Sequence, residues 1–438
     1  MKIAVIFVFT LFAMVFSDCN GGGQPTPTPT PAPTPTPPPP HQVVIEKELM
    51  ITDLAVVNST EATSEGAFSI KTILSNMALN GQTAKEMMLS LLTSWESPQT
   101  VNTFQIPARQ TIRSRIIDPW KSKDGAAGKP DAEWNMNFAN APFRLLAVVN
   151  RIDLHRKEGA VVKNAGEGRF VFGVLDPTGG PLLFTVIFEF EQKATSEAEL
   201  KAWADEWHNL GTFPAFDANY LTALKAVTAK FSGKGVMPGK PNDSALNQLR
   251  TNEIALSAPW ELREFNISAS TGTFEPATTK QTPHHSFNNS PRLADYVLAH
   301  QTEIESGSDV VPLEFPPGQP FMSGNAHVPP PTGAGFWDAP GLTNDVAEFK
   351  FSVATCSACH GRETQTQFTH VKPRPQGQAA ELSGFLTGIT VTDPRNAATQ
   401  HEFNDLRDRA LILNFLTGAT VPSSTIDSIL ADRAKRVH

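Results

Sequence analysis

Cysteine is scarce in this chain, which has 3 cysteines among 438 residues. Three cysteines cannot form the disulfide framework of a small secreted scaffold. Charged residues make up only 18% of the chain, the net charge is −8, and no stretch concentrates lysine and arginine. Without a basic surface we expect no binding to nucleic acid. Apolar residues make up 40%, which is typical of a folded chain, and the length suffices for one large or two ordinary domains.

The N-terminal apolar run, residues 3–16, is too short to cross a bilayer comfortably as a helix. It follows a single lysine and therefore predicts a signal peptide over residues 1–18. Cys19 comes directly afterwards, and this arrangement resembles a bacterial lipoprotein signal. The resemblance implies an exported protein, periplasmic or at the cell surface, that is anchored to a bacterial membrane by lipid on Cys19. The alternative is a plain signal peptide or an uncleaved anchor, and either would still export the protein.

Proline is concentrated next to this signal, with 10 of the 36 prolines in residues 25–40. Alternating proline favours an extended polyproline II backbone without internal hydrogen bonds. At about 3.1 Å per residue, this segment would be a semi-rigid stalk of roughly 50 Å. We therefore interpret residues 19–41 as a lipidation site followed by a spacer.

The long region 42–330 carries mixed helix and strand signals without a repeat. Thr83 with Glu86, and Ser196 with Glu199, form capping-box patterns that predict two helices. Turn residues between two β-rich runs predict an antiparallel hairpin. The strands expected are 143–149, 169–175, 182–190 and 260–267, and further helices are expected over 217–231 and from near Asp243. Because strands and helices are segregated, the pattern predicts an α+β domain over residues 42–330.

No catalytic signature is present in this region. It has no G-x-S-x-G elbow, no H-E-x-x-H pair and no phosphate-binding glycine loop. The adjacent His284 and His285 lie in a loop rich in proline and asparagine, so we expect exposed imidazoles rather than metal ligands. Acidic residues such as Asp153 and Glu189 show no spacing that indicates a catalytic pair. The sequence does not predict what this region binds.

One motif carries chemistry: Cys356, Cys359 and His360 form a C-x-x-C-H string. This string is the signature of c-type haem attachment. Two thiols three positions apart can add to the two vinyl groups on one edge of a porphyrin. The next residue then presents an imidazole to the iron.

At these residues the chain resembles c-type cytochromes. The resemblance implies haem c held by thioether bonds to Cys356 and Cys359, with His360 as the proximal iron ligand and electron transfer as the function. Apolar spacing predicts a helix before the motif and another after it, as in the two-helix frame of that family, over residues 346–356 and 403–416. Phe349, Phe351 and Val353 also alternate, so a strand is the alternative for the first of these segments. The predicted fold class is thus an α+β domain followed by a mainly α, cytochrome c-like domain over residues 331–438.

The sixth iron ligand is left open between two histidines. No methionine follows Met322, so a downstream methionine cannot supply it. His370, in a loop bounded by proline, is the favoured distal ligand, and His401 is the alternative. An open position or another ligand is the third possibility.

Residues 341–438 carry ten Lys/Arg and ten Asp/Glu. We therefore expect a redox partner, either a protein or a small-molecule donor or acceptor, to dock without strong electrostatic steering. Two other functions are a haem-dependent oxidoreductase with its substrate bound by the middle region, and a surface binding module with a structural metal or haem site. The cysteine pair could instead hold zinc, act as a thioredoxin-like dithiol or form a disulfide.

Overall fold

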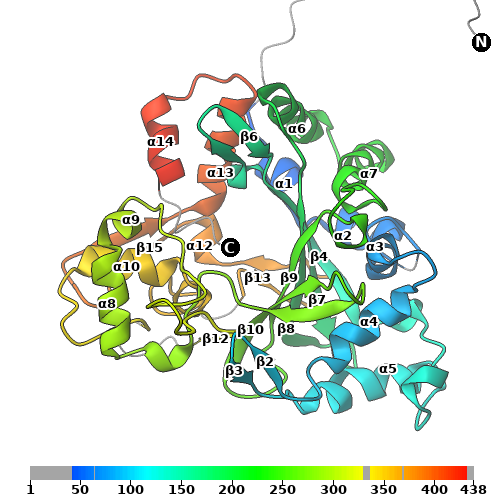
Figure 1. Ribbon diagram of the computed structural model, residues 1–438. Coiled ribbons are helices and arrows are strands. Elements are labelled where there is room, and N and C mark those ends of the chain that lie inside the picture. Colours follow the sequence, from blue (N-terminus) through cyan, green and yellow to red (C-terminus); the bar gives the residue numbers. More distant parts are fainter. Residues whose placement is uncertain (1–41, 64, 329–335, 367–368, 432–438) are drawn as a thin grey trace, which may run out of the picture. The chain divides into compact units, whose positions relative to one another are not determined.

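The computed structural model describes residues 42–63, 65–328, 336–366 and 369–431. The predicted signal peptide, Cys19 and the proline-rich spacer lie outside these residues. Within the described part, an eight-stranded antiparallel sheet is the central element, with the order β1-β4-β7-β8-β9-β10-β11 and β12 also paired with β10 (Figure 1). Its strands are β1 (Met50–Ile51), β4 (Phe143–Arg151), β7 (Glu167–Leu175), β8 (Pro181–Glu191), β9 (Leu246–Asn252), β10 (Trp260–Ile267), β11 (Phe274–Ala277) and β12 (Asn325–Val328).

The four strands expected from the sequence are confirmed as β4, β7, β8 and β10. The expected hairpin is confirmed too, because β7 and β8 pair in antiparallel register. The helix expected from near Asp243 is wrong. A single turn, Pro241–Asp243, is followed there by β9. This segment is hydrogen-bonded to β8 on one side and β10 on the other, so tertiary pairing overrides its local helical pattern.

The two faces of the sheet differ in chemistry, as the alternation along β8 shows. Phe184, Phe188 and their neighbours at every second position are buried in the main hydrophobic core. The intervening positions, Thr185, Ile187 and Glu189, point to the opposite face and line a cavity. Successive side chains of a strand point to opposite faces, so the sheet has one apolar face and one mixed face that carries charges.

Helices cover the apolar face, on the right in Figure 1. The capping box at Thr83 is formed as expected, and Ser196 and Asp217 cap the next two helices. The elements before β10 are α1 (Ile45–Glu48), α2 (Leu54–Val57), α3 (Ile70–Met77), α4 (Ala84–Thr93), α5 (Asp118–Lys123), α6 (Glu197–Asn209), α7 (Ala218–Ser232) and the hairpins β2–β3 (Gln99–Val101, Phe104–Ile106) and β5–β6 (Arg156–Glu158, Val161–Asn164).

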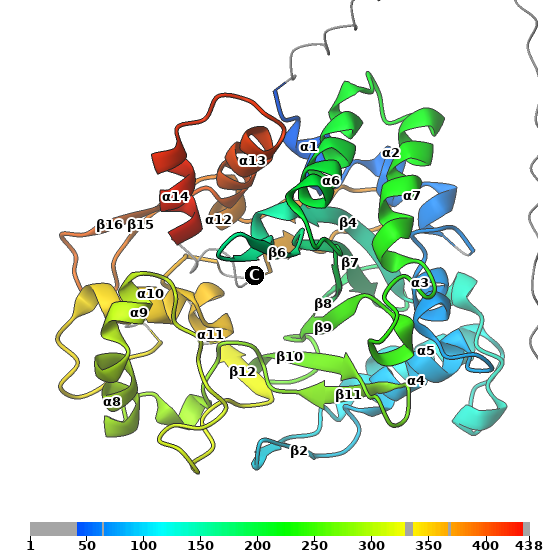
Figure 2. The ribbon, with the colours of Figure 1, turned by 45° about the horizontal axis from the view of Figure 1, so that its top comes forward.

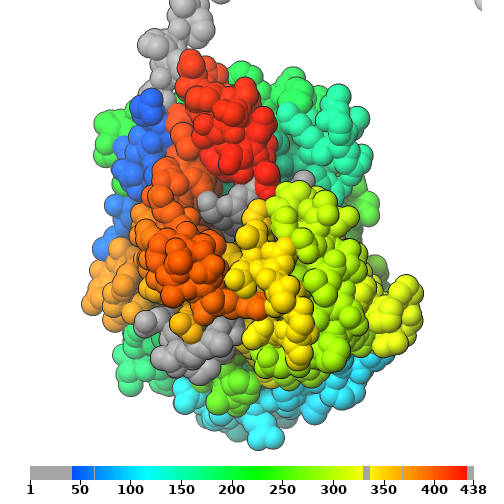
Figure 3. Space-filling model, turned by 90° about the vertical axis from the view of Figure 1, so that its left-hand side faces the viewer, coloured from blue at the N-terminus to red at the C-terminus, as the bar shows by residue number. Residues whose placement is uncertain are grey.

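Short helices and hairpins from the last third of the chain lie on the other side of the sheet (Figure 2). Their outer surface is the face drawn in yellow to red in Figure 3. They are α8 (Pro291–Ala299), α9 (Gln301–Glu305), α10 (Asp345–Val353), α11 (Cys356–Cys359), α12 (Gly384–Thr387), α13 (Asp405–Leu416), α14 (Ser423–Ala431) and the hairpins β13–β14 (Val371–Lys372, Glu381–Leu382) and β15–β16 (Ile389–Thr392, Gln400–Phe403).

The predicted fold class is wrong for residues 331–438, which do not form a mainly α, cytochrome c-like domain. The described part of this region contains two hairpins as well as helices. The helix expected before the motif exists as α10, yet it is buried on two sides. Phe349 packs into a cluster with sheet residues that include Val171, whereas Phe351 packs with residues of α8. Because α10 is wedged between these clusters, it does not form one half of a self-contained two-helix frame. The described residues from 42 to 431 belong to one compact unit.

Candidate haem site

The motif forms the single helical turn α11, which ends at His360. The Thr355 side chain caps this turn by accepting a hydrogen bond from the backbone of Ala358. Cys356 and Cys359 are one turn apart, buried, and not joined in a disulfide. The local structure therefore presents the two thiols and the imidazole in the order that haem attachment requires.

The turn is anchored on strand β10 and on the segment after β11. The backbone N–H of Cys356 donates to Thr282 Oγ1 at 3.0 Å, and its Sγ lies 4.0 Å from the carbonyl oxygen of Lys280. Cys356 also packs with Trp260, whose ring centroid is 5.9 Å from that of His360. The motif is thus held by residues about 75 to 100 positions earlier in the chain.

The structure brings His370 to the motif. Its Nε2 lies 3.5 Å from Cys359 Sγ, and its ring centroid is 4.5 Å from that of His360. Its Nδ1 lies 2.9 Å from Ser383 Oγ. A hydrogen bond at one ring nitrogen is the usual way in which a metal-ligating histidine is oriented through its other nitrogen.

His401 lies elsewhere. Its Nε2 is 2.8 Å from Asp393 Oδ2, and its ring stacks on Phe349 with a centroid distance of 3.4 Å. It is not among the residues that line the cavity at the motif. Of the two distal ligands considered, only His370 is placed beside Cys359 and His360.

A cavity of about 90 Å³, the motif cavity, separates α11 from the mixed face of the sheet. Its walls combine the motif, aliphatic side chains and arginines, and include Cys356, His360, His370, Val149, Val171, Ile187, Leu262, Phe385, Arg151, Arg169, Arg250 and Arg409. Most of the charged residues come from strands of the sheet. They occupy the positions between the residues that point into the apolar core.

Buried ion pairs surround the motif cavity. Arg151 donates to both carboxylate oxygens of Asp153 at 2.9–3.2 Å, and Arg169 lies 3.1 Å from Glu189, its register partner on β8. Arg409 pairs with the carboxylate four residues earlier in α13. Burial lowers the pKa of Arg409 to about 10, because the charged guanidinium has lost its hydration.

Several buried polar atoms of the cavity wall have no hydrogen-bond partner among the described residues. Those that also lack an ion-pair partner there are Arg151 Nη1, Arg409 Nη1, Thr185 Oγ1 and Thr279 Oγ1. Buried polar groups in folded proteins are nearly always paired, so this cluster indicates a polar or anionic group that binds here. Haem carries two carboxylates together with an iron that accepts imidazole, and the residues present therefore fit it.

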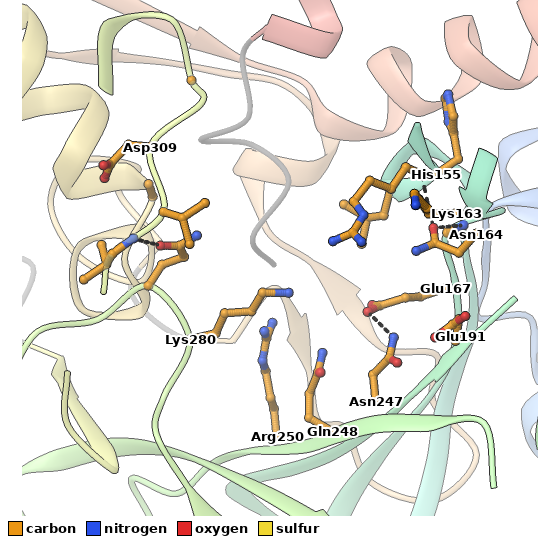
Figure 4. A pocket seen from close by; sticks show the side chains of 18 of the residues that line it. His155, Lys163, Asn164, Glu167, Glu191, Asn247, Gln248, Arg250, Lys280 and Asp309 are labelled. Carbon is orange, nitrogen blue, oxygen red and sulfur yellow. Dashed lines mark hydrogen bonds between the residues drawn. The ribbon is translucent and has the colours of Figure 1, made fainter. Parts of the chain in front are cut away.

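The volume of the motif cavity limits how haem could be accommodated there. Ligand pockets commonly enclose roughly 300–1,000 Å³, so the motif cavity of about 90 Å³ is too small for a porphyrin. Arg169 and Arg250 also line a second space of about 600 Å³, the open cleft, which borders the motif cavity (Figure 4). Haem therefore requires α11 and the segment around His370 to move away from the sheet, or part of the group to extend into the open cleft.

The thiols do not have the environment of a reactive dithiol. Burial raises the pKa of Cys356 to about 11, and it also raises the pKa of Cys359. Redox-active dithiols instead have lowered thiol pKa values. The structure therefore disfavours the thioredoxin-like alternative.

His284 and His285 are half-buried, so their expected exposure is wrong. His284 stacks on Phe104, and His285 stacks on His327 with a centroid distance of 3.6 Å. Burial lowers the pKa of both His284 and His285 to about 4. Across the described residues, no group of three or more His, Cys, Asp or Glu side chains could hold a metal ion.

Sequence reasoning identified the motif and His370 but missed the charged wall. The spacing of Glu189 in the sequence indicates no site, and no motif marks Arg151, Arg169 or Arg409. A signal existed in β7 and β8, where charged residues alternate with phenylalanines. Such alternation predicts a strand whose second face meets something other than the apolar core.

No family model, no curated protein and no solved structure matches this chain. In the part of the chain that the structure describes, no helix is both long and apolar enough to cross a membrane.

Proposed function

We propose that this protein is an exported, c-type cytochrome-like electron-transfer protein that binds haem covalently through Cys356 and Cys359. His360 would be the proximal ligand to its iron and His370 the distal one. When bound, haem supplies an iron centre that exchanges one electron. The observation that carries the proposal is the approach of His370 to Cys359 and His360 beside a wall of buried, unpaired polar atoms.

The chain's own residues would position and enclose this centre. Ser383 orients His370, and Thr355 fixes the turn that carries the cysteines. Aliphatic side chains of the sheet, such as Val171 and Leu262, exclude water from the motif cavity. The export signal and the lipid anchor at Cys19 remain predictions from the sequence, and they agree with attachment of haem outside the cytoplasm.

The test is to produce the full chain together with the cytochrome c maturation machinery. We expect a haem stain that survives a denaturing gel and a pyridine haemochrome spectrum of a c-type haem. A Cys356→Ala, Cys359→Ala double variant is the control and should lose the stain. Protein that carries no covalent haem under these conditions would overturn the proposal and shift the weight to a zinc or disulfide site.

A second candidate is a haem-dependent oxidoreductase. The observation that favours it is the open cleft, whose volume of about 600 Å³ lies within the range of small-molecule sites. A haem spectrum that responds to added small molecules would support it. A haem that is reduced and reoxidised but ignores them would support electron transfer alone.

A further inference from the structure

The open cleft is rich in positive charge, although the protein as a whole is acidic. Six lysine or arginine residues line it against three acidic ones, whereas the chain has a net charge of −8. The basic residues are Arg156, Lys163, Arg169, Arg250, Lys280 and Lys350, and the acidic residues are Glu167, Glu191 and Asp309. A concave surface with one dominant sign of charge attracts ligands of the opposite sign.

Most of these cations already have partners within the protein. Arg156 and Lys163 both pair with Glu158, at 3.3 and 2.9 Å. Lys350 donates to the backbone carbonyl of Glu305. These three side chains are therefore already held by the walls of the cleft.

Lys280 is different. Among the described residues its ammonium group forms no hydrogen bond and no ion pair within 4 Å, although its charge acts on the nearby Glu167 and Glu264, and the residue is exposed. Figure 4 shows its side chain extending into the cleft beside that of Arg250. Arg250 is buried between Glu189 and Glu264, at 3.5 and 3.1 Å, and is held in place by them.

This pair of cations lies next to the motif. The carbonyl oxygen of Lys280 is 4.0 Å from Cys356 Sγ, and Arg250 lines the motif cavity as well as the cleft. An anion held between Lys280 and Arg250 would therefore sit at the border of the proposed haem site.

We propose that the open cleft is a carboxylate-binding site in which Lys280 and Arg250 hold the anion beside the motif. The carboxylate has two possible sources: a small organic acid that enters from solvent, or the propionate edge of the haem itself. Only the second source rests on the proposed function. In both cases the ammonium of Lys280 supplies the charge-assisted hydrogen bond. Arg250 lies beside it as a guanidinium that Glu189 and Glu264 hold in place, so it shapes the site and adds less net charge than Lys280 does.

The first experiment titrates citrate into the haem-loaded protein by calorimetry at low ionic strength. If the carboxylate comes from solvent, citrate binds, and Lys280→Gln weakens its affinity by roughly three- to tenfold, the range for a partly exposed charged hydrogen bond. Lys234→Gln is the matched control, because Lys234 is exposed and does not line the cleft. This control should bind citrate like the unmodified chain.

The second experiment measures the midpoint potential of the haem in the same three proteins. If the propionates occupy the cleft, citrate does not bind, and Lys280→Gln lowers the potential because one positive charge near the iron has been removed. Lys234→Gln should leave the potential unchanged.

A Lys280→Gln variant that changes neither citrate affinity nor potential overturns the carboxylate site. The proposed function can fail separately. A chain that carries no covalent haem but binds citrate through Lys280 would support the carboxylate site and overturn the cytochrome proposal. A chain that carries covalent haem but shows no effect of Lys280→Gln would support the cytochrome proposal and overturn the carboxylate site.

Discussion

At the scale of single residues, the site depends on how side chains near the motif are held. The imidazole of His370 is fixed by Ser383 and faces Cys359, whereas that of His401 is engaged by Asp393 and covered by Phe349. Both histidines follow the motif, and only tertiary contacts distinguish them.

Under the proposed function, replacing His370 should therefore change the haem spectrum, and replacing His401 should not. We expect His370→Ala to convert a low-spin visible spectrum to a high-spin one, because the iron loses its second imidazole. His401→Ala is the matched control, with the same change of side chain on the same side of the motif. A low-spin spectrum that persists in both variants would show that the sixth ligand is neither residue.

The buried pair of Arg151 and Asp153 gives a prediction on stability. Arg151→Met should lower the free energy of unfolding by about 3–5 kcal/mol, because Asp153 keeps a buried charge with a poorer partner. Adding Asp153→Leu should restore much of this loss, and the coupling can be read from a double-mutant cycle in denaturant. Additive losses would mean that the two side chains do not act as a pair.

At the scale of secondary structure, the sequence predicted elements well where local signals agree with burial. The capping box of Thr83 and the hairpin of β7 and β8 were both visible in the sequence. β9 was not, because its pairing with β8 and β10 is decided far away in the chain. The position of α10 is not predictable from the sequence for a similar reason. Its apolar residues are compatible with a helix in many folds. Only the tertiary contacts, with the sheet on one side and with α8 on the other, show that it lies between two clusters.

Helix α10 also buries a carboxyl group whose titration affects stability. Burial raises the pKa of Glu348 to about 8. The hydrogen bond that Ser352 donates to Glu348 lowers this pKa in part, whereas the nearby charge of Glu363 raises it further. A carboxyl group with a folded pKa above its unfolded value of 4.5 stabilises the fold fully at pH values below about 4.5. That stabilisation is lost as pH rises through about 8.

Glu348→Gln should remove this dependence, because glutamine can still accept the hydrogen bond from Ser352 but cannot ionise. We expect the variant to be more stable than the unmodified chain at pH 8, by on the order of 2–4 kcal/mol, and similar to it near pH 4.5. Denaturant unfolding across this pH range is the measurement. Glu275→Gln, an exposed carboxylate on β11, is the control, and parallel curves for all three proteins would refute the assignment.

At the scale of the whole molecule, the motif and the sheet share one hydrophobic cluster. Leu146 and Val171 of the sheet pack in it with Phe349, Cys359 and Leu406. Neither part can bury this surface without the other. The domain boundary that the sequence predicts near residue 330 therefore does not separate two independent hydrophobic cores.

Dividing the chain there should expose that surface. We expect residues 42–328 produced alone to bind a hydrophobic dye such as ANS, and residues 336–438 alone to lack near-ultraviolet circular dichroism, because each has lost its packing partner. Mixing the two pieces should reduce dye binding. A C-terminal piece that unfolds cooperatively by itself would contradict a shared core.

The burial of both thiols has a consequence for the order of events during maturation. In the folded chain Cys356 and Cys359 are almost completely covered, so an attachment enzyme could not reach them. Under the proposed function, haem ligation and closure of α11 onto the sheet therefore compete in time. The sheet strands precede the motif in the chain, so if the protein is exported as proposed, a binding surface for α11 would be ready as soon as the cysteines emerge. Slow haem supply would then trap the protein in a stable form that haem cannot enter.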